Sequence, residues 1–160
     1  MRKDILAAAM LGVASLGLAG CGEQASAPEE AAPEGVPGMS VENARMVLAP
    51  VAGNPAAVYF DLSYDGETNT TLRRADVAGA ESSMMHDYGE WAGKMEMAEM
   101  GPLLLQKGDK VSFKPGSKHI MAMKVSPELK PGDTTEVTLT VIGGDKFSFT
   151  AEVRAAGDER

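Results

Sequence analysis

The residues of this sequence that could carry out chemistry are concentrated between Met84 and Met123. This window holds both histidines of the chain and seven of its eleven methionines. Imidazole nitrogen and thioether sulfur form a ligand set that suits Cu(I), whereas Ca²⁺ and Mg²⁺ require oxygen ligands and structural zinc sites favour thiolate. Methionine is also an adaptable filler of protein cores, so the window predicts a copper site only if its members converge on one face.

The spacing of four of these residues allows such convergence. Side chains two positions apart on a strand point to the same face, so His119 and Met121 project together. His86 and Met97 flank a segment that contains glycine. If that segment folds back as a hairpin, the two residues lie nearly opposite one another across the ladder. A neighbouring strand that carries His119 and Met121 would then complete a site of two imidazoles and two thioethers.

The gaps between these four residues carry a resemblance to a known family. Ten residues separate His86 from Met97, twenty-one separate Met97 from His119, and one separates His119 from Met121. This spacing resembles the H-X10-M-X21-H-X-M motif of the periplasmic Cu(A) chaperone family, PCuAC. The resemblance implies a cupredoxin-like Greek-key β-sandwich or partly open barrel that holds one Cu(I) ion near its surface and passes it to other proteins. The surrounding stretches that also resemble the family are residues 57–59, 94–97, 115–121, 129–133 and 138–140.

Three more methionines lie in phase with the motif residues. Each stands two positions along the chain from one of them: Met84, Met95 and Met123. These methionines are candidates either for auxiliary ligands or for an apolar rim around the ion. Some members of the family also carry a His- and Met-rich C-terminal tail with a Cu(II) site. Residues 155–160 contain neither residue type, so no second copper site is expected there.

The elements that must position these residues read as strands over most of the chain from Val41 to Arg154. Runs of β-forming residues end at Gly, Pro or Asp turn signals. No run combines helical periodicity with caps, although residues 82–100 also have helical propensity. Short, evenly spaced strands predict an all-β domain, either a sandwich or a partly open barrel. The expected strands cover residues 57–64, 71–77, 111–113, 119–125, 135–141 and 146–153.

The N-terminus resembles the signal peptide of a bacterial lipoprotein. Arg2 and Lys3 precede an apolar run over residues 5–18, which is shorter than the roughly 20 residues of a membrane-spanning helix. The run leads into Leu-Ala-Gly-Cys, which resembles a lipobox ending at Cys21, the single cysteine of the chain. A lipidated Cys21 implies an anchor at the periplasmic face of the cell envelope, with membrane contact through the lipid alone. The alternative is an ordinary signal peptide with a cysteine near its cleavage site.

These features divide the chain into three parts. Residues 1–20 form the lipoprotein signal peptide, residues 21–38 the lipidated cysteine and a flexible tether, and residues 39–155 the copper-binding β-domain. The tether is rich in Ala, Pro and Glu, and offers too little apolar surface to form a core. The net charge of −8 and the lack of a basic stripe argue against nucleic acid as a partner.

Four functions are compatible with such a chain. The resemblance favours a copper chaperone, whose partners would be another copper chaperone and an apo-cuproprotein client, the Cu(A) centre of cytochrome c oxidase subunit II. The same site could instead sequester copper. A blue-copper electron carrier requires a cysteine ligand, which the mature chain lacks if Cys21 is lipidated. In the fourth alternative, the methionines only fill the core of an envelope β-domain. No catalytic triad, carboxylate pair or phosphate-binding loop is apparent, so no enzymatic activity is expected.

Overall fold

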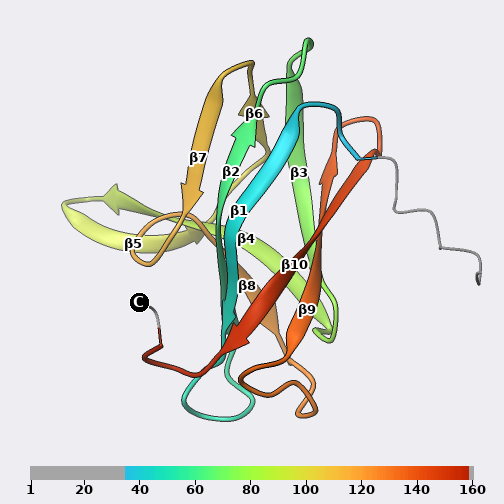
Figure 1. The fold of residues 1–160 in the computed structure, drawn as a ribbon. Helices are drawn as coiled ribbons and strands as arrows, with labels where there is room; N and C mark the ends of the chain where they lie inside the picture. The colour runs from blue at the N-terminus through green and yellow to red at the C-terminus, as the bar shows by residue number, and fades with distance from the viewer. Residues whose placement is uncertain (1–34, 159–160) are drawn as a thin grey trace, which may run out of the picture.

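The computed structural model describes residues 35–158, which form ten β-strands and no helix (Figure 1). The predictions for the signal peptide, for Cys21 and for residues 22–34 of the tether fall outside this range. Within it, nothing resembles a helix long and apolar enough to cross a membrane. The strands are β1 (Met39–Val47), β2 (Ala56–Tyr64), β3 (Thr70–Val77), β4 (Ser82–Trp91), β5 (Lys94–Glu99), β6 (Leu103–Leu105), β7 (Asp109–Phe113), β8 (His119–Met123), β9 (Thr134–Val141) and β10 (Lys146–Arg154).

The strands join into one sheet that folds over on itself (Figure 1). Its order is β5-β4-β8-β2-β1-β10-β9-β3-β6, and β7 pairs with β2 on the same side as β8. β1 and β10 run parallel, whereas the other paired strands are antiparallel. The sheet does not close between β3 and β4, which form no ladder with each other in the described residues. The predicted all-β architecture is therefore confirmed as a sandwich left open along one side.

A core of apolar side chains fills the space between the layers. Phe60 of β2 stacks on Phe113 of β7 with 4.3 Å between ring centroids, and its ring lies 5.0 Å from that of Phe149. Met46 of β1 is fully buried, so this methionine belongs to the core. Burial of apolar surface stabilises a fold by about 25 cal/mol per Å². The core thus provides a fixed frame for the strands that carry the histidines.

All six predicted strands are confirmed. They correspond to β2, β3, β7, β8, β9 and β10, with boundaries that differ by at most two residues. β1 and β6 were not predicted as separate strands. Residues 82–100, which also have helical propensity, form β4 and β5. Pairing of β4 with β8 explains this outcome, because tertiary pairing readily overrides a weak local preference.

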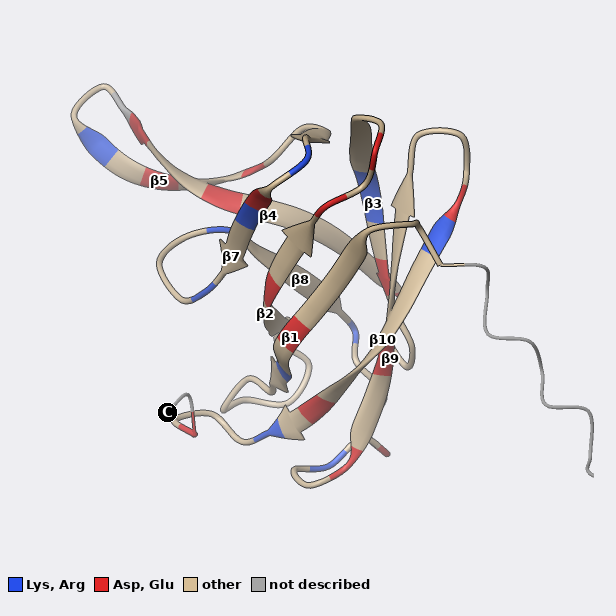
Figure 2. Ribbon diagram, turned by 45° about the horizontal axis from the view of Figure 1, so that its top comes forward, with Lys and Arg blue, Asp and Glu red and all other residues tan. Residues whose placement is uncertain are grey.

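β4 and β5 form a hairpin that projects from the body of the sandwich (Figures 1 and 2). Its turn consists of Ala92 and Gly93, both with positive φ, as a two-residue type I′ turn requires. β5 lies at one end of the sheet, and all of its residues are exposed. We call residues 88–99 the hairpin arm. Its charged residues, visible in Figure 2, are mostly acidic: Glu90, Lys94, Glu96 and Glu99.

The described chain begins on the other side of the domain from the hairpin arm (Figure 1). Gly35 lies beside Phe147 of β10, and a Cβ at Gly35 would be 3.7 Å from the phenylalanine ring. Val36 is buried and belongs to the hydrophobic core. The chain is therefore packed against the sandwich before β1 begins.

Candidate metal centre

Two neighbouring strands bring both histidines together on the outer face of the sandwich. In the ladder between β4 and β8, His86 pairs with His119 and Met84 pairs with Met121. Paired residues point to the same face, while Ile120 between the two β8 residues is fully buried on the core side. The imidazole rings of His86 and His119 are 5.9 Å apart between centroids and meet edge to face at 62°. Three of the four motif residues thus share one face of adjacent strands.

Met97 joins this face from β5, in a register that differs from the predicted one. The sequence predicts Met97 nearly opposite His86, whereas Met97 pairs with Tyr88 and His86 pairs with Glu99. The prediction was wrong by two residues, because the position of the two-residue turn fixes the register of the hairpin. A shift of two residues keeps the side chains on the same face. Met97 is therefore a diagonal neighbour of His86, and such neighbours lie roughly 7–8 Å apart, within reach of long side chains.

A hollow of about 310 Å³ lies over this face. It is bounded by β2, β4, β5, β8 and the turn that precedes β8. Its wall contains three motif residues and two aromatic rings: Met97, His119, Met121, Tyr59 and Tyr88. His86 is outside the lining and stands beside the hollow, next to His119.

The ring of His119 is held in one orientation. The residue is 6% exposed, and its Nδ1 lies 2.8 Å from the backbone oxygen of Ser117. A carbonyl oxygen only accepts hydrogen bonds, so Nδ1 carries the proton and donates it. In the neutral ring, Nε2 is then left with a free lone pair. Metal-binding histidines typically have this arrangement, in which one ring nitrogen donates to a backbone carbonyl and the other binds the metal.

His86 has an unsatisfied nitrogen. Its Nδ1 is buried and has no hydrogen-bond partner in the described part of the chain. A buried polar atom without a partner costs about 1–3 kcal/mol, and such atoms are rare in native proteins. Burial, followed by the Coulombic effect of His119, lowers the pKa of His86, while Glu99 acts in the opposite direction. The lowered pKa favours the neutral form of the ring, which is the form that binds a metal.

The donor set of this face is nitrogen and sulfur. Among residues 35–158, no three side chains of His, Cys, Asp and Glu converge to hold a metal ion. Two imidazoles with thioethers on the same face suit a soft ion, above all Cu(I).

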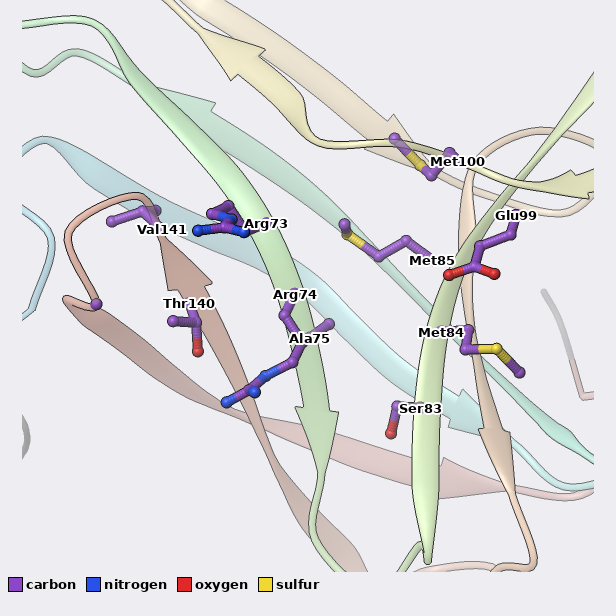
Figure 3. A pocket seen from close by; sticks show the side chains of 11 residues that line it. Arg73, Arg74, Ala75, Ser83, Met84, Met85, Glu99, Met100, Thr140 and Val141 are labelled. Atoms are coloured by element: carbon purple, nitrogen blue, oxygen red, sulfur yellow. The ribbon is translucent and has the colours of Figure 1, made fainter.

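The three additional methionines lie on both sides of the motif residues. Met84 pairs with Met121, next to the histidine pair, whereas Met123 pairs with Ser82 and lies two residues further along β8. Figure 3 shows Met84 on one side of β4 and Met85 on the other, where Met85 is part of the core. Met95 is on the hairpin arm, two residues beyond Met97, and is exposed. All three thus share the face of the candidate ligands, as their phase in the sequence predicts.

A second hollow, of about 510 Å³, lies in the open side of the sandwich between β3 and β4 (Figure 3). Arg73 and Arg74 line it from β3, and Met85 and Glu99 line it from the hairpin side. Met84 is the single member of the predicted set in its wall. This hollow is larger, but the four motif residues do not converge on it.

Sequence reasoning did not single out two residues that shape the site. Ser117 orients the ring of His119 through its backbone oxygen, which every residue type has, so the serine side chain gives no indication of this contact. Tyr59 packs its ring 6.3 Å from that of His119, between centroids. The position of Tyr59 follows from the alternation of faces along β2. Ala57 pairs with Met121, and Tyr59, two residues further on, shares the face of Ala57 and therefore that of the site. Using this alternation as a signal requires the β2–β8 register, which the sequence does not specify.

Comparisons with known proteins agree with this fold. The copper-bound PCuAC domain from PmoF2 is 18% identical, with a TM-score of 0.61, and the match covers 77% of this chain and 97% of that one. The apo PCuAC domain from PmoF1 is 22% identical, with a TM-score of 0.63 and coverages of 77% and 98%. The solution structure of CuI-DR1885 from Deinococcus radiodurans is 23% identical, with a TM-score of 0.51 and coverages of 83% and 89%.

These solved structures share the fold of this chain, which confirms the predicted PCuAC-type, cupredoxin-like architecture. No curated protein matches the chain significantly. A family model does match, over residues 39–153, and its members are described as LpqE-like lipoproteins. Because this match spans most of the chain, the protein belongs to the LpqE-like lipoprotein family.

Proposed function

We propose that this protein is a copper chaperone of the cell envelope, which binds one Cu(I) ion through His86, Met97, His119 and Met121. The observation that carries the proposal is the register between β4 and β8, which sets His86 opposite His119. Met121 shares this face, and Met97 joins it from β5. The unsatisfied Nδ1 of His86 supports the assignment, because a bond to a metal ion would satisfy that atom.

The donor set also fits the chemistry of copper outside the cytoplasm. Thioethers carry no proton and form no disulfide, so an oxidising or mildly acidic compartment does not block them. Protons compete with the copper ion only at the histidines. Burial lowers the pKa of His86, which reduces this competition. Thioethers contribute little to zinc binding, so the site should select Cu(I) over Zn²⁺.

Related structures support copper as the cargo. A PCuAC domain of the same fold has been solved in a copper-bound form, and DR1885 has been solved with Cu(I). The PCuAC resemblance extends the proposal to delivery: the client is an apo-cuproprotein, the Cu(A) centre of cytochrome c oxidase subunit II, and another copper chaperone is a further partner. The protein itself catalyses no reaction in this scheme, because a bound ion is passed on unchanged.

The family and the N-terminus support a location in the cell envelope. The description of the matching family names a lipoprotein, and Cys21 stands where a lipobox places the acylated cysteine. We extend the proposal to a mature protein that begins at lipidated Cys21 and contacts the membrane through its lipid. The tether expected over residues 21–38 would then connect the lipid to the β-domain expected at residues 39–155, although Val36 is buried in the core and so already belongs to the domain. The anchor raises the local concentration of the domain near membrane-bound clients.

A Cu(I) titration against the chelator bicinchoninate tests the proposal. We expect one equivalent of Cu(I) per protein, and no displacement by an equal concentration of Zn²⁺. A stoichiometry of zero, or equal competition by zinc, would overturn the copper site. A second measurement, of the transfer of bound Cu(I) to the soluble domain of apo-cytochrome c oxidase subunit II, distinguishes delivery of copper from sequestration. Rapid transfer supports delivery, whereas retention against that acceptor supports sequestration.

A further inference from the structure

The four proposed ligands are supported very differently by the fold. His119 and Met121 lie on β8, which is paired with β4 on one side and β2 on the other. His119 is 6% exposed and has a fixed ring. Met97 is 43% exposed and lies on β5, at the end of the sheet. One ligand of the site is therefore held far less firmly than the others.

The hairpin arm that carries Met97 has little support of its own. All residues of β5 are exposed, and in the described part of the chain this strand pairs with β4 alone. A two-stranded hairpin without a packed face is marginally stable in water. Segments with few buried contacts also open most readily. Gly89, in the middle of the β4 half, has open space around the position of a Cβ, so no packing restrains it.

The base of the arm is fixed, in contrast to its outer part. Lys118 Nζ donates to Asp87 Oδ2 at 2.7 Å, which ties the turn before β8 to the last residue before the arm. The backbone N–H of Met100 donates to the oxygen of Met85, which is buried in the core. Movement of the arm is therefore confined to the residues beyond these two attachments, and Met97 is among them.

Exposed apolar side chains are concentrated on one face of this arm. Three of the six large hydrophobic residues that the described chain exposes lie there: Tyr88, Met95 and Met97. Met95 is 64% exposed and follows Met97 toward the tip of the arm on the same face. Exposed apolar groups that cluster mark surfaces with a binding role more often than isolated ones do. The clustering distinguishes Met95 from a methionine that only fills space.

We propose that the hairpin arm is the exchange element of the copper site, an inference that rests on the function proposed above. Met97 is the ligand that is replaced first, and Met95 is a transient ligand that the ion binds on its way to an acceptor. The bond from copper to the Met97 sulfur breaks as bonds to the Met95 sulfur and then to the donor atom of the acceptor form. Copper remains Cu(I) throughout, and no proton moves, because thioethers are neutral and carry none.

The substitution Met95→Leu tests whether Met95 acts during copper transfer and not in equilibrium copper binding. We expect the Cu(I) dissociation constant, measured by competition with bicinchoninate, to remain that of the wild type. The rate of Cu(I) transfer to excess bicinchoninate, followed by stopped-flow absorbance, should fall about tenfold, which corresponds to roughly 1.4 kcal/mol of transition-state stabilisation. Met123→Leu is the matched control, because it removes a thioether from the same face but from β8, where Met123 pairs with Ser82 beyond the four proposed ligands and away from the arm. The control should leave the transfer rate unchanged.

The outcomes distinguish this inference from the proposed function. A wild-type protein that binds no Cu(I) refutes both. A wild type that binds Cu(I), with Met95→Leu transferring at the same rate, refutes the exchange role alone. Equal slowing in Met123→Leu also refutes it, because the arm would then have no special part. Hydrogen exchange of the metal-free protein adds an independent readout: amides of residues 94–99 should exchange faster than those of β8, and equal protection would contradict a mobile arm.

Discussion

His86 and His119 occupy directly paired positions on β4 and β8, with their ring centroids 5.9 Å apart. In the sequence these residues are separated by the rest of the β4–β5 hairpin and by β6 and β7, so only the sheet brings them together. One ring is oriented by a backbone oxygen, and the other has a buried nitrogen without a partner. The pair therefore provides two imidazole rings on one face of adjacent strands, to which thioethers from β8 and β5 can add.

Replacement of a single proposed ligand should weaken Cu(I) binding without unfolding the domain. Met97→Leu and Met121→Leu conserve volume and should cost less than about 1.5 kcal/mol of stability. Loss of a residue that only supports a ligand typically reduces metal affinity 10–100-fold, so loss of a ligand should cost at least about tenfold. His86→Phe and His119→Phe should show the same loss. Chelator competition measures the affinity, and thermal unfolding measures the stability.

Met46→Leu is the control for this series, because Met46 is fully buried on the core side of the sheet, opposite to the face that carries the proposed ligands. It should leave the Cu(I) affinity unchanged. Binding of wild-type strength by both Met97→Leu and Met121→Leu would show that thioethers are not ligands here.

The stability of the metal-free domain should depend on pH through His86. Burial, followed by the charge of His119, lowers the pKa of His86 below its usual value of 6.5. The unfolded chain therefore takes up a proton at a higher pH than the folded domain does. This contribution to stability is fully present above pH 6.5 and is lost as the pH falls through the lowered pKa. Urea unfolding of the wild type and of His86→Phe, compared between about pH 5 and 7.5, should show a smaller loss in the variant. Parallel curves would contradict this account.

Weakening the base of the hairpin arm should accelerate copper release. Asp87→Asn removes the ion pair with Lys118. Because the side chains of both residues are partly exposed, the loss of this ion pair should cost less than about 1 kcal/mol of stability. The rate of Cu(I) transfer to bicinchoninate should increase, because the attachment at the base no longer restrains the arm. Glu81→Gln is the matched control: it breaks the exposed ion pair with Lys124, which lies away from the arm. A rise in rate in the control as well would point to a general effect of charge.

The location of the protein should depend on Cys21. Cys21→Ser removes the thiol that a lipobox offers for acylation, so the variant should leave the membrane fraction or accumulate as an uncleaved precursor. Metabolic labelling with a fatty acid should mark the wild type and not the variant. A wild-type protein that is wholly soluble and unlabelled would contradict the lipid anchor.

Much of the architecture was predictable from local sequence, and the reason is visible in β9 and β10. Alternation of Val137 and Leu139 with threonines indicates a half-buried strand without any knowledge of its partners. The turn signal at Gly143 and Gly144 indicates the connection that follows. The same local logic placed six strands within two residues of their positions.

Relationships between strands were harder to predict, as Met97 illustrates. The face of the sheet on which Met97 lies was predicted correctly, because side chains alternate between the two faces of a strand. Its partner across the ladder, however, is Tyr88. The register depends on where a two-residue turn falls, and Ala92 is not a residue that marks a type I′ turn by its identity. The hydrogen bond that orients the ring of His119 was likewise not predictable from the sequence, because a residue of any type at position 117 has the backbone oxygen that accepts it.

The placement of Gly35 has a consequence for how the domain meets other molecules. The chain enters the sandwich beside β10, whereas the hairpin arm projects from the other side (Figure 1). An attachment at the N-terminal end therefore meets the domain on a different side from the hairpin arm. A copper acceptor can approach the exposed side chains of the arm without steric competition from that attachment. The strand with the least support thus faces away from the end of the chain that a lipid would hold.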